Sequence, residues 1–273
     1  MYSTKHISSL QNPLIKRVLL LKEKSRERKK TGLFVLEGLI ELQIASRSDY
    51  EIDTVFYCAD IINESQSDSF LKSFSPEKLI SVSNDVYKKM AYRDTTEGVL
   101  AIVKSKDHLL SSLKFNHKNP LLLIAEAPEK PGNIGALLRT ADAANLDAVL
   151  IANPKTDLYN PNIIRSSVGC VFSRNIKIGS TTEIITYLKK EGFQVYCAAL
   201  SSSKEYTTVD FKGPTAIVVG TENSGLSDEW LQNSTQNIII PMEGEIDSMN
   251  VSVSAAILIF EAKRQRKLNL QEA

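Results

Sequence analysis

The stretch NIIIPMEGEIDSMNVSVSAAILIFEAKRQRK, residues 237–267, decides the fold prediction for this chain. Its apolar residues 238–240 predict a buried strand that ends at Pro241, because proline cannot donate to a sheet ladder. A seven-residue loop follows, and an apolar helix is predicted to begin near Asn250. Ser248 and Asn250 are residue types that cap helix N-termini through side-chain oxygens. Such a loop often holds a ligand in α/β proteins, although an ordinary, well-capped crossover fits the same residues.

Five further apolar runs lie upstream of this stretch, and helical patterns separate them. Near-continuous apolar strands that alternate with helices are typical of a parallel sheet covered on both faces. The predicted strands are 121–127, 147–152, 174–179, 194–200, 215–221 and 237–242. We therefore predict that residues 121–273 form one α/β domain.

A smaller α/β domain is predicted over residues 31–104, with strands at 33–37, 52–58, 78–83 and 99–104. It has no nucleophile elbow, phosphate loop or metal-binding motif, so binding is favoured over chemistry. The polar segment 105–120 is predicted to connect the two domains.

Positive charge concentrates at the N-terminus. Residues 1–30 carry nine Lys and Arg against two Glu, an excess of +7, whereas the whole chain has a net charge of +1. Residues 12–30 are predicted to form one helix whose C-terminal half is basic. Such asymmetry favours contact with a polyanion, and the alternative is a solvated helix face.

The composition favours a cytoplasmic protein. Apolar content of 42% and charged content of 24% are typical of a globular chain. No run of eighteen apolar residues and no signal peptide is present, so no membrane contact is expected. The three cysteines are widely spaced, as thiols of a reducing compartment would be, and the three histidines lack the spacing of metal ligands.

Two strand–turn–helix segments add candidate site residues. After the strand at 121–127, Asn133 is predicted to cap a helix, and Arg139 on that helix is placed to bind phosphate, or is a surface arginine. The glycine fingerprint of dinucleotide-binding proteins is absent there. After the strand at 215–221, Gly220 is predicted to let the backbone approach a ligand, with Glu222 beside it. The alternative is a polar turn with an exposed acid.

These segments together resemble the SpoU, or TrmH, family of RNA ribose 2′-O-methyltransferases in the SPOUT superfamily. The matching motifs are NIGALLRTA at 133–141, IVVGTENSGLS at 217–227 and IIIPMEGEIDSMNVSVSAAI at 238–257. The resemblance covers roughly 121–267, and the smaller domain is similar to the substrate-binding domain that often precedes it. Thr221, Asn223, Ser224 and Met249 depart from the usual motif residues, which bears on specificity more than on activity.

The resemblance implies a knotted (trefoil) parallel-sheet domain that holds S-adenosylmethionine. The residues implied to touch the cofactor are Gly220, Ile240, Met242 and Met249. Those implied to form the catalytic site are Asn133, Arg139, Glu222, Ser248 and Asn250. A guanidinium has a pKa above about 12, so we expect Arg139 to orient the hydroxyl or a phosphate, although the family's usual role for it is the base.

The implied reaction is methylation of a ribose 2′-hydroxyl, with 23S ribosomal RNA favoured as the substrate. The alternatives are a tRNA methyltransferase, a non-catalytic RNA-binding ribosome-assembly factor, or an α/β enzyme that uses another nucleotide. The residues predicted to bind RNA are Arg26, Arg28, Lys29, Lys30 and Arg165.

A homodimer is predicted through the C-terminal helix. Apolar side chains surround the axis of residues 251–267, and a helix that is apolar all round is normally covered on all sides. A second copy would cover the side that the sheet leaves open. The resemblance implies such a dimer as well.

Overall fold

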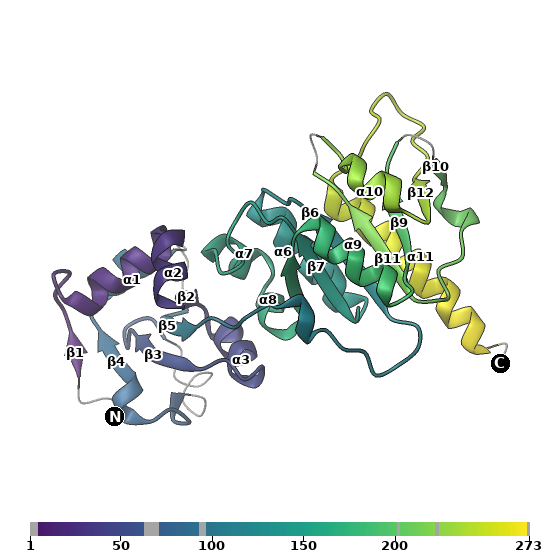
Figure 1. The fold of residues 1–273 in the computed structure, drawn as a ribbon. Helices are drawn as coiled ribbons and strands as arrows, with labels where there is room; N and C mark the ends of the chain where they lie inside the picture. Colours follow the sequence, from purple (N-terminus) through teal and green to yellow (C-terminus); the bar gives the residue numbers. More distant parts are fainter. Residues whose placement is uncertain (1–4, 63–70, 93–96, 201–202, 222–223, 272–273) are drawn as a thin grey trace. The chain divides into compact units, whose positions relative to one another are not determined.

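The computed structural model describes residues 5–62, 71–92, 97–200, 203–221 and 224–271. The chain forms two compact units, whose elements are labelled in Figure 1. Unit 1 is Met1–Asp107 with Asp157–Ser173, and unit 2 is His108–Thr156 with Arg174–Ala273. Residues 157–173 therefore pack with the N-terminal part of the chain, although they lie inside the stretch predicted as the C-terminal domain.

Unit 1 contains a mixed sheet with the strand order β1-β4-β3-β5-β2. The strands are β1 (His6–Ile7), β2 (Leu33–Glu37), β3 (Ile52–Tyr57), β4 (Leu79–Val82) and β5 (Val99–Lys104). Strand β5 runs antiparallel to both β2 and β3, and the other pairs are parallel. Four of these strands match the predicted ones, and the two-residue β1 was not predicted.

The helices of unit 1 surround this sheet. They are α1 (Pro13–Glu23), α2 (Ser25–Thr31), α3 (Leu39–Arg47), α5 (Asn84–Met90), α7 (Pro161–Ser166) and α8 (Cys170–Ser173). The single helix predicted over 12–30 is wrong, because Lys24 adopts an extended conformation between α1 and α2. The buried residues Ile15, Val18 and Leu21 form the apolar stripe of α1, which packs against β2.

Unit 2 contains a seven-stranded sheet in which every neighbouring pair is parallel, as predicted. The strand order is β10-β12-β9-β11-β6-β7-β8. The strands are β6 (Leu121–Glu126), β7 (Ala148–Ala152), β8 (Ile176–Gly179), β9 (Gln194–Ala198), β10 (Ser203–Glu205), β11 (Thr215–Val219) and β12 (Gln236–Ile239). The polar edge strand β10 was not predicted.

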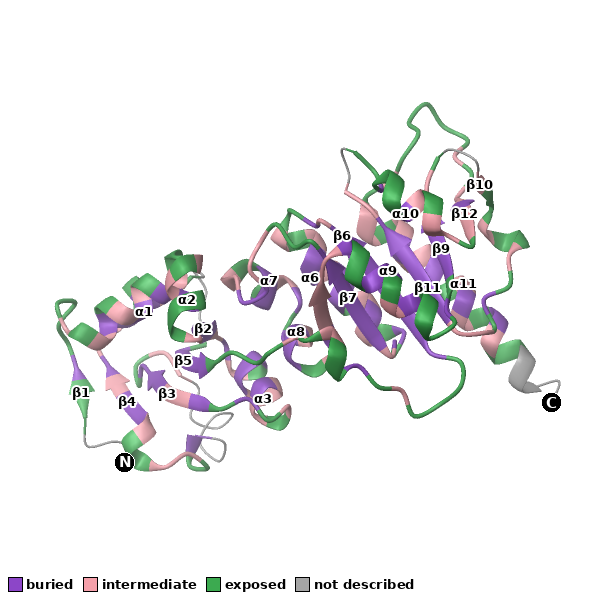
Figure 2. Cartoon of the chain, in the orientation of Figure 1, coloured by how far each residue is buried: buried purple, intermediate pink, exposed green. Residues whose placement is uncertain are grey.

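Helices cover both faces of the unit 2 sheet. They are α6 (Pro131–Ala143), α9 (Thr181–Lys190), α10 (Asp228–Asn233) and α11 (Val251–Gln271). Helices α9 and α10 share one core with alternate strand residues such as Leu122, Leu150 and Val218. Helices α6 and α11 pack on each other and on the opposite face of the sheet. The strand residues that alternate with those of the first core point toward this opposite face. Figure 2 shows the central strands as the buried interior of this unit.

Candidate active site

A cavity of about 540 Å³ lies at the carboxyl edge of the unit 2 sheet. Parallel strands end on the same side of a sheet, so the segments that follow β9, β11 and β12 meet at this edge. These strand ends, five residues of the segment 240–249 and the first turns of α11 line the cavity. Its volume lies within the range of about 300–1,000 Å³ that is usual for small-molecule sites.

All four residues predicted to touch the cofactor line this cavity: Gly220, Ile240, Met242 and Met249. Ile240, Met242 and Met249 are half-buried, so each presents apolar surface to the cavity while staying packed. Ser248, predicted at the catalytic site, also lines the cavity and is exposed. The structure therefore brings together residues from two separate sequence motifs.

The absence of a side chain at Gly220 lets another part of the backbone, at Gly225, lie close to it. A Cβ atom at Gly220 would lie 2.3 Å from the carbonyl carbon and oxygen of Gly225. The two backbone bonds between Thr221 and Gly225, at 3.2 and 3.1 Å, hold this tight turn closed. The predicted reason for a glycine here, room for a ligand, therefore needs correction: the turn itself excludes any side chain. A Gly220→Val variant would disrupt the loop before it tested ligand binding.

A second, smaller hollow of about 30 Å³ adjoins the cavity. Both are lined by Gly220, Thr221 and Val251, so the two spaces share a wall. Asn133 lines the smaller hollow, and its Oδ1 accepts a hydrogen bond of 3.3 Å from Nδ2 of Asn250. The asparagines of the first and third motifs, 117 residues apart in sequence, therefore meet at the smaller hollow.

The two asparagines have different local roles. Asn250 caps α11, because its Oδ1 accepts from the backbone N–H of Ser252 at 3.0 Å and from the Ser252 hydroxyl at 2.6 Å. Its predicted capping role is confirmed. Asn133 is not a cap, contrary to prediction: Lys130 is the N-cap of α6 and Pro131 occupies the first turn. Asn133 lies in that first turn instead.

The structure does not place Arg139 or Glu222, the other predicted catalytic residues, beside this asparagine pair. Arg139 is exposed on α6 and lines neither the cavity nor the smaller hollow. It lies six residues beyond Asn133, on a different face of the helix. Glu222 lies outside the described residues, so the structure does not place it.

Comparison with protein families settles the classification. The model of the SpoU rRNA Methylase family matches residues 120–260, more than half of the chain. The chain belongs to this family. A model of the MRM3-like substrate binding domain matches residues 12–101, which lie in unit 1. The predicted family and α/β fold class are confirmed, and SpoU membership carries with it the trefoil knot.

Full-length relatives agree with this classification. The 23S rRNA (guanosine(2553)-2′-O)-methyltransferase RlmP of Bacillus subtilis is 27% identical over 259 residues, which cover 95% of this chain and 99% of that protein. A crystal structure of an RNA 2′-O ribose methyltransferase has a TM-score of 0.84 at 34% identity, covering 96% and 99% of the two chains. An AdoMet-bound rRNA methyltransferase from Sinorhizobium meliloti has a TM-score of 0.87 at 26% identity, covering 95% and 97%.

One residue important to the SpoU site was not predicted. Glu126, at the end of β6, is only 7% exposed. Its carboxylate accepts from the Ser227 backbone N–H at 2.8 Å, from the Ser227 hydroxyl at 2.7 Å and from the Thr181 hydroxyl at 3.2 Å. These bonds fix the end of the loop that follows β11. An acid inside the apolar run LLLIAEA was the available signal, because a buried charge requires partners.

Cys197 also lies within the core of the SpoU unit, on β9. Burial, and then the negative charge of Glu126, raises the pKa of the Cys197 thiol to about 12. The thiol therefore remains protonated at neutral pH and is not a nucleophile. Among the described residues, no group of three or more His, Cys, Asp or Glu side chains is placed to hold a metal ion.

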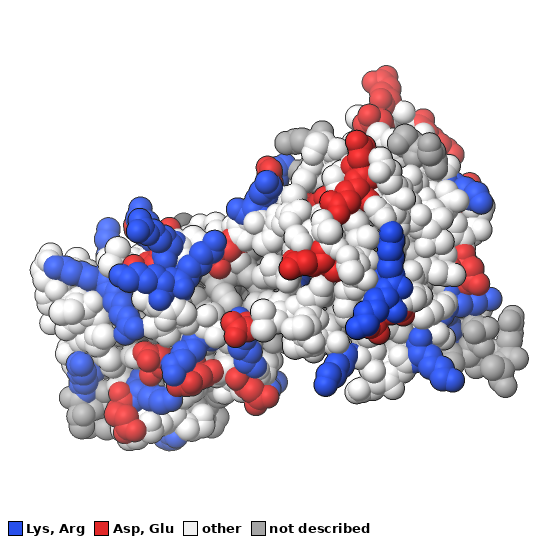
Figure 3. All heavy atoms as spheres, in the orientation of Figure 1, with Lys and Arg blue, Asp and Glu red and all other residues white. Residues whose placement is uncertain are grey.

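The five residues predicted to bind RNA lie in unit 1, where four are exposed and one is buried. Arg26, Lys29 and Lys30 are exposed on α2, and Arg165 is exposed on α7. Figure 3 shows Lys and Arg side chains on the surface over α1 and α2. A basic, exposed helix of this kind suits sequence-independent contacts with phosphates.

Arg28 is the exception, and its prediction as an RNA contact is wrong. It is 6% exposed and forms a buried ion pair with Asp157. Its Nη1 also donates to the carbonyl oxygens of Leu21 at 2.7 Å and Lys22 at 3.2 Å. With its guanidinium directed inward, Arg28 joins α2 to the segment 157–173 and does not face RNA.

Proposed function

We propose that this chain transfers the methyl group of S-adenosylmethionine to a ribose 2′-hydroxyl of 23S ribosomal RNA. The single observation that supports this most is the Asn133–Asn250 pair, which lies at a small hollow that shares a wall with a cavity of cofactor size in a SpoU family member. The methyl carbon leaves sulfur and bonds to the ribose oxygen, and the hydroxyl proton is released. We assign the chemistry to unit 2 and substrate binding to unit 1, and place the reaction in the cytoplasm.

S-adenosylmethionine supplies a methyl group activated by its positive sulfonium. The cavity fits such a molecule in size and lining: it combines half-buried apolar side chains with strand ends whose backbone polar groups can bind an adenine and an amino acid. We assign cofactor contacts to Gly220, Ile240, Met242 and Met249. The S. meliloti relative has AdoMet bound, and this chain uses the same cofactor.

We assign the positioning of the acceptor to Asn133, Ser248 and Asn250. Side-chain amides donate and accept hydrogen bonds, so the asparagine pair can hold a ribose hydroxyl beside the cavity. Alignment of acceptor and donor removes much of the barrier to such a transfer. We assign Arg139, exposed on α6, to an RNA phosphate, which suits a permanently charged, planar guanidinium. The catalytic assignment of Glu222 remains a sequence prediction.

Ribosomal RNA is favoured by relatives that match this chain over nearly its whole length. The B. subtilis relative is named for 23S rRNA and covers both units of the chain. The test is to map 2′-O-methylated nucleotides in total RNA from a strain that lacks the gene. We expect one position of 23S rRNA to lose its methyl group and to regain it on complementation. Loss in a tRNA, or no loss in any RNA, would contradict the assignment.

The exposed cations of α2 are expected to contribute to RNA affinity. Replacing Arg26, Lys29 and Lys30 with Gln should weaken binding of RNA and should reduce the slope of log K against log salt by about two to three, because each lost phosphate contact changes that slope by about 0.7–0.9. Arg28 is left unchanged, since its buried ion pair supports the fold. Filter binding at several salt concentrations measures the effect.

The matched control removes three exposed lysines of unit 2: Lys190, Lys204 and Lys212. This control loses the same net charge, so we expect only a small change in the salt slope. Equal slopes for the wild-type chain and the α2 variant would assign these cations to a solvated helix face.

We further propose that the protein is a homodimer through α11. Val253 and Phe260 are 48% and 50% exposed, and Ile257 between them is half-buried. Their spacing of four and three residues places them on one face of the helix, away from Leu258 and Ile259 in the core. A two-fold contact with a second copy would cover this apolar face.

Phe260→Glu is expected to convert the dimer to a monomer, because it places a charge in the apolar face. Light scattering at micromolar concentration measures the mass. Thr186→Glu, on the exposed side of α9, is the control and should leave the mass unchanged. A wild-type chain that scatters as a single copy would refute the dimer.

A further inference from the structure

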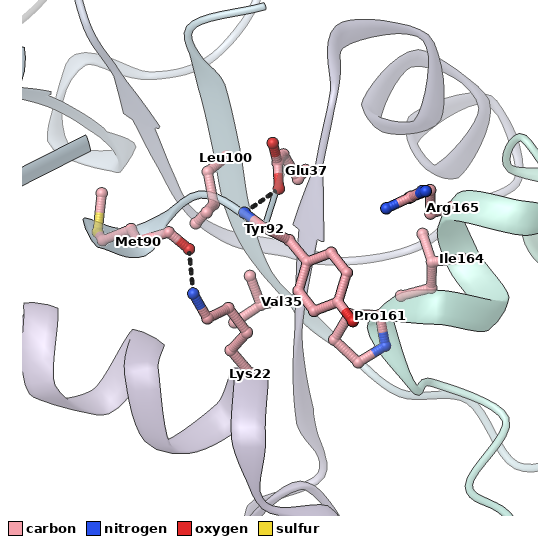
Figure 4. Close-up of a pocket in the computed structure, with 9 residues that line it drawn as sticks. All are labelled: Lys22, Val35, Glu37, Met90, Tyr92, Leu100, Pro161, Ile164 and Arg165. Atoms are coloured by element: carbon pink, nitrogen blue, oxygen red, sulfur yellow. Dashed lines mark hydrogen bonds between the residues drawn. The ribbon is translucent and has the colours of Figure 1, made fainter. Parts of the chain in front are cut away.

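Unit 1 contains a hollow to which no role has been assigned so far, although Arg165 beside it is a predicted RNA contact. Lys22 at the end of α1, Glu37 at the end of β2, Tyr92 just after α5 and Arg165 on α7 surround it, and Val35 and Leu100 form its apolar floor. Figure 4 shows these side chains around the hollow. The hollow lies wholly within unit 1, to which the matched substrate-binding domain belongs.

Tyr92 combines an exposed ring with a fixed backbone. The residue is 42% exposed, and its backbone N–H donates to Oε2 of Glu37 at 2.6 Å. The preceding carbonyl groups, of residues 89, 90 and 91, accept from Nζ of Lys22 at 3.3, 3.1 and 3.0 Å. The backbone that carries Tyr92 is therefore fixed while the residue stays exposed, which favours its use as a stacking platform.

Arg165 approaches the same hollow from α7. Asn160 caps this helix, and the buried residues Ile163 and Ile164 fix it to the core of unit 1. The Arg165 side chain is exposed and points toward the hollow from the side opposite Lys22 (Figure 4). Pro161, one turn earlier, presents a half-buried apolar surface near the tip of Tyr92. The hollow thus offers an aromatic face, an apolar floor and a cation.

Lys22 has a different role in this arrangement. Its ammonium group donates to three carbonyl oxygens at the C-terminus of α5, where a cation is favourable. All three of its N–H donors therefore have partners in the protein. Arg165 is consequently the exposed cation beside this hollow that a ligand could reach.

We infer that the surface over this hollow, whose own volume is only about 20 Å³, binds one unpaired nucleotide of the RNA, with its base stacked on the exposed side of Tyr92 and its phosphate on Arg165. Sequence-tolerant recognition of single-stranded RNA uses this pairing of an aromatic ring with a cation. The exposed cations Arg26, Lys29 and Lys30 of the same unit provide the charge complementarity that favours RNA over a peptide. The inference rests on the proposed function, because it concerns how the RNA substrate is held.

The test uses the full-length chain and measures the affinity for two probes, a fluorescent mixed-sequence single-stranded RNA and the same strand in a duplex. Tyr92→Ala should weaken single-strand binding about tenfold, which is within the range for loss of one stacked base, and should leave duplex binding nearly unchanged. Tyr92→Phe keeps the ring and should bind within about twofold of wild type. Arg165→Gln should weaken binding and reduce the salt slope by about one, whereas Tyr92→Ala should leave the slope unchanged.

Two matched controls lie outside the hollow. Arg47→Gln removes an exposed arginine of α3 in unit 1, and Tyr206→Ala removes a half-buried tyrosine of unit 2. Neither should change single-strand affinity. Thermal unfolding of each variant verifies that the substituted unit remains folded.

The outcomes separate this inference from the proposed function. Wild-type affinity of Tyr92→Ala for single-stranded RNA, or an equal loss for the duplex, would overturn the inference even if the chain methylates rRNA. A selective loss for single strands would support it even if the methylated RNA proves to be a tRNA. Failure of the wild-type chain to bind the single-stranded probe would overturn the inference, whereas the proposed function is overturned only by the absence of methyl transfer to 23S rRNA.

Discussion

Replacing Ser254 with phenylalanine is expected to weaken binding of S-adenosylmethionine by about a hundredfold. Val251, Ser254 and Leu258 all line the cavity of about 540 Å³. Their spacing of three and four residues places them on one face of α11, so the Ser254 side chain points into the cavity. A phenyl ring at this position would occupy space that the cofactor requires.

Isothermal titration calorimetry with S-adenosylmethionine and its demethylated product, without added metal, measures this effect. Ser254→Ala is the matched control, because it removes the hydroxyl and leaves the cavity open, and it should bind nearly as wild type does. Thermal unfolding of both variants separates a filled cavity from a damaged fold. Wild-type affinity in a folded Ser254→Phe protein would show that the cofactor binds elsewhere.

Replacing Asn250 is expected to reduce methyl transfer by about a hundredfold while changing cofactor affinity much less. The substitution removes the amide that donates to Asn133 at 3.3 Å. Asn250→Ala would also remove the cap of α11, which costs about 1 kcal/mol of stability. Asn250→Ser separates the two effects, since serine caps a helix well but has no amide group to meet Asn133.

Single-turnover transfer at saturating cofactor measures the chemical step of Asn250→Ser. Asn133→Ala should produce a similar defect, and the double variant should be little worse than either single one, because the two amides act as one unit. The partner Asn133 does not cap its helix, so its loss should not destabilise α6 in that way. Full activity in Asn250→Ser would remove the asparagine pair from the reaction.

The sheet and the cofactor cavity could be predicted because their signals are local. The central strands β6, β7, β9 and β11 are nearly continuous apolar runs, and the motif loops follow directly from β11 and β12. Strand β10 reads SKE, which is polar and short, because it lies at the sheet edge and needs no apolar face. The two-residue β1 gives too short a pattern to be detected.

The features that were missed depend on contacts between distant residues. Arg28 belongs to a basic run typical of a solvated helix, yet its partner Asp157 lies 129 residues later. Nothing local to Lys24 marks the end of α1, since neither proline nor glycine occurs there. Gly220 was correctly placed at the cavity, but only the structure shows that Gly225 leaves no room for its Cβ atom. In each case the role of the residue depends on its neighbours in the folded chain, which its type alone does not reveal.

The most direct test of the account is methyl transfer by the purified chain. Protein with tritiated S-adenosylmethionine would be incubated with 23S rRNA from a strain that lacks the gene, and the labelled RNA would be hydrolysed in alkali. A methyl group on a ribose 2′-oxygen blocks cleavage of the adjacent phosphodiester, so we predict that the label appears in an alkali-resistant dinucleotide and is lost with Asn250→Ser. Label recovered in mononucleotides, which indicates methylation of a base, or no transfer to any RNA, would contradict the account.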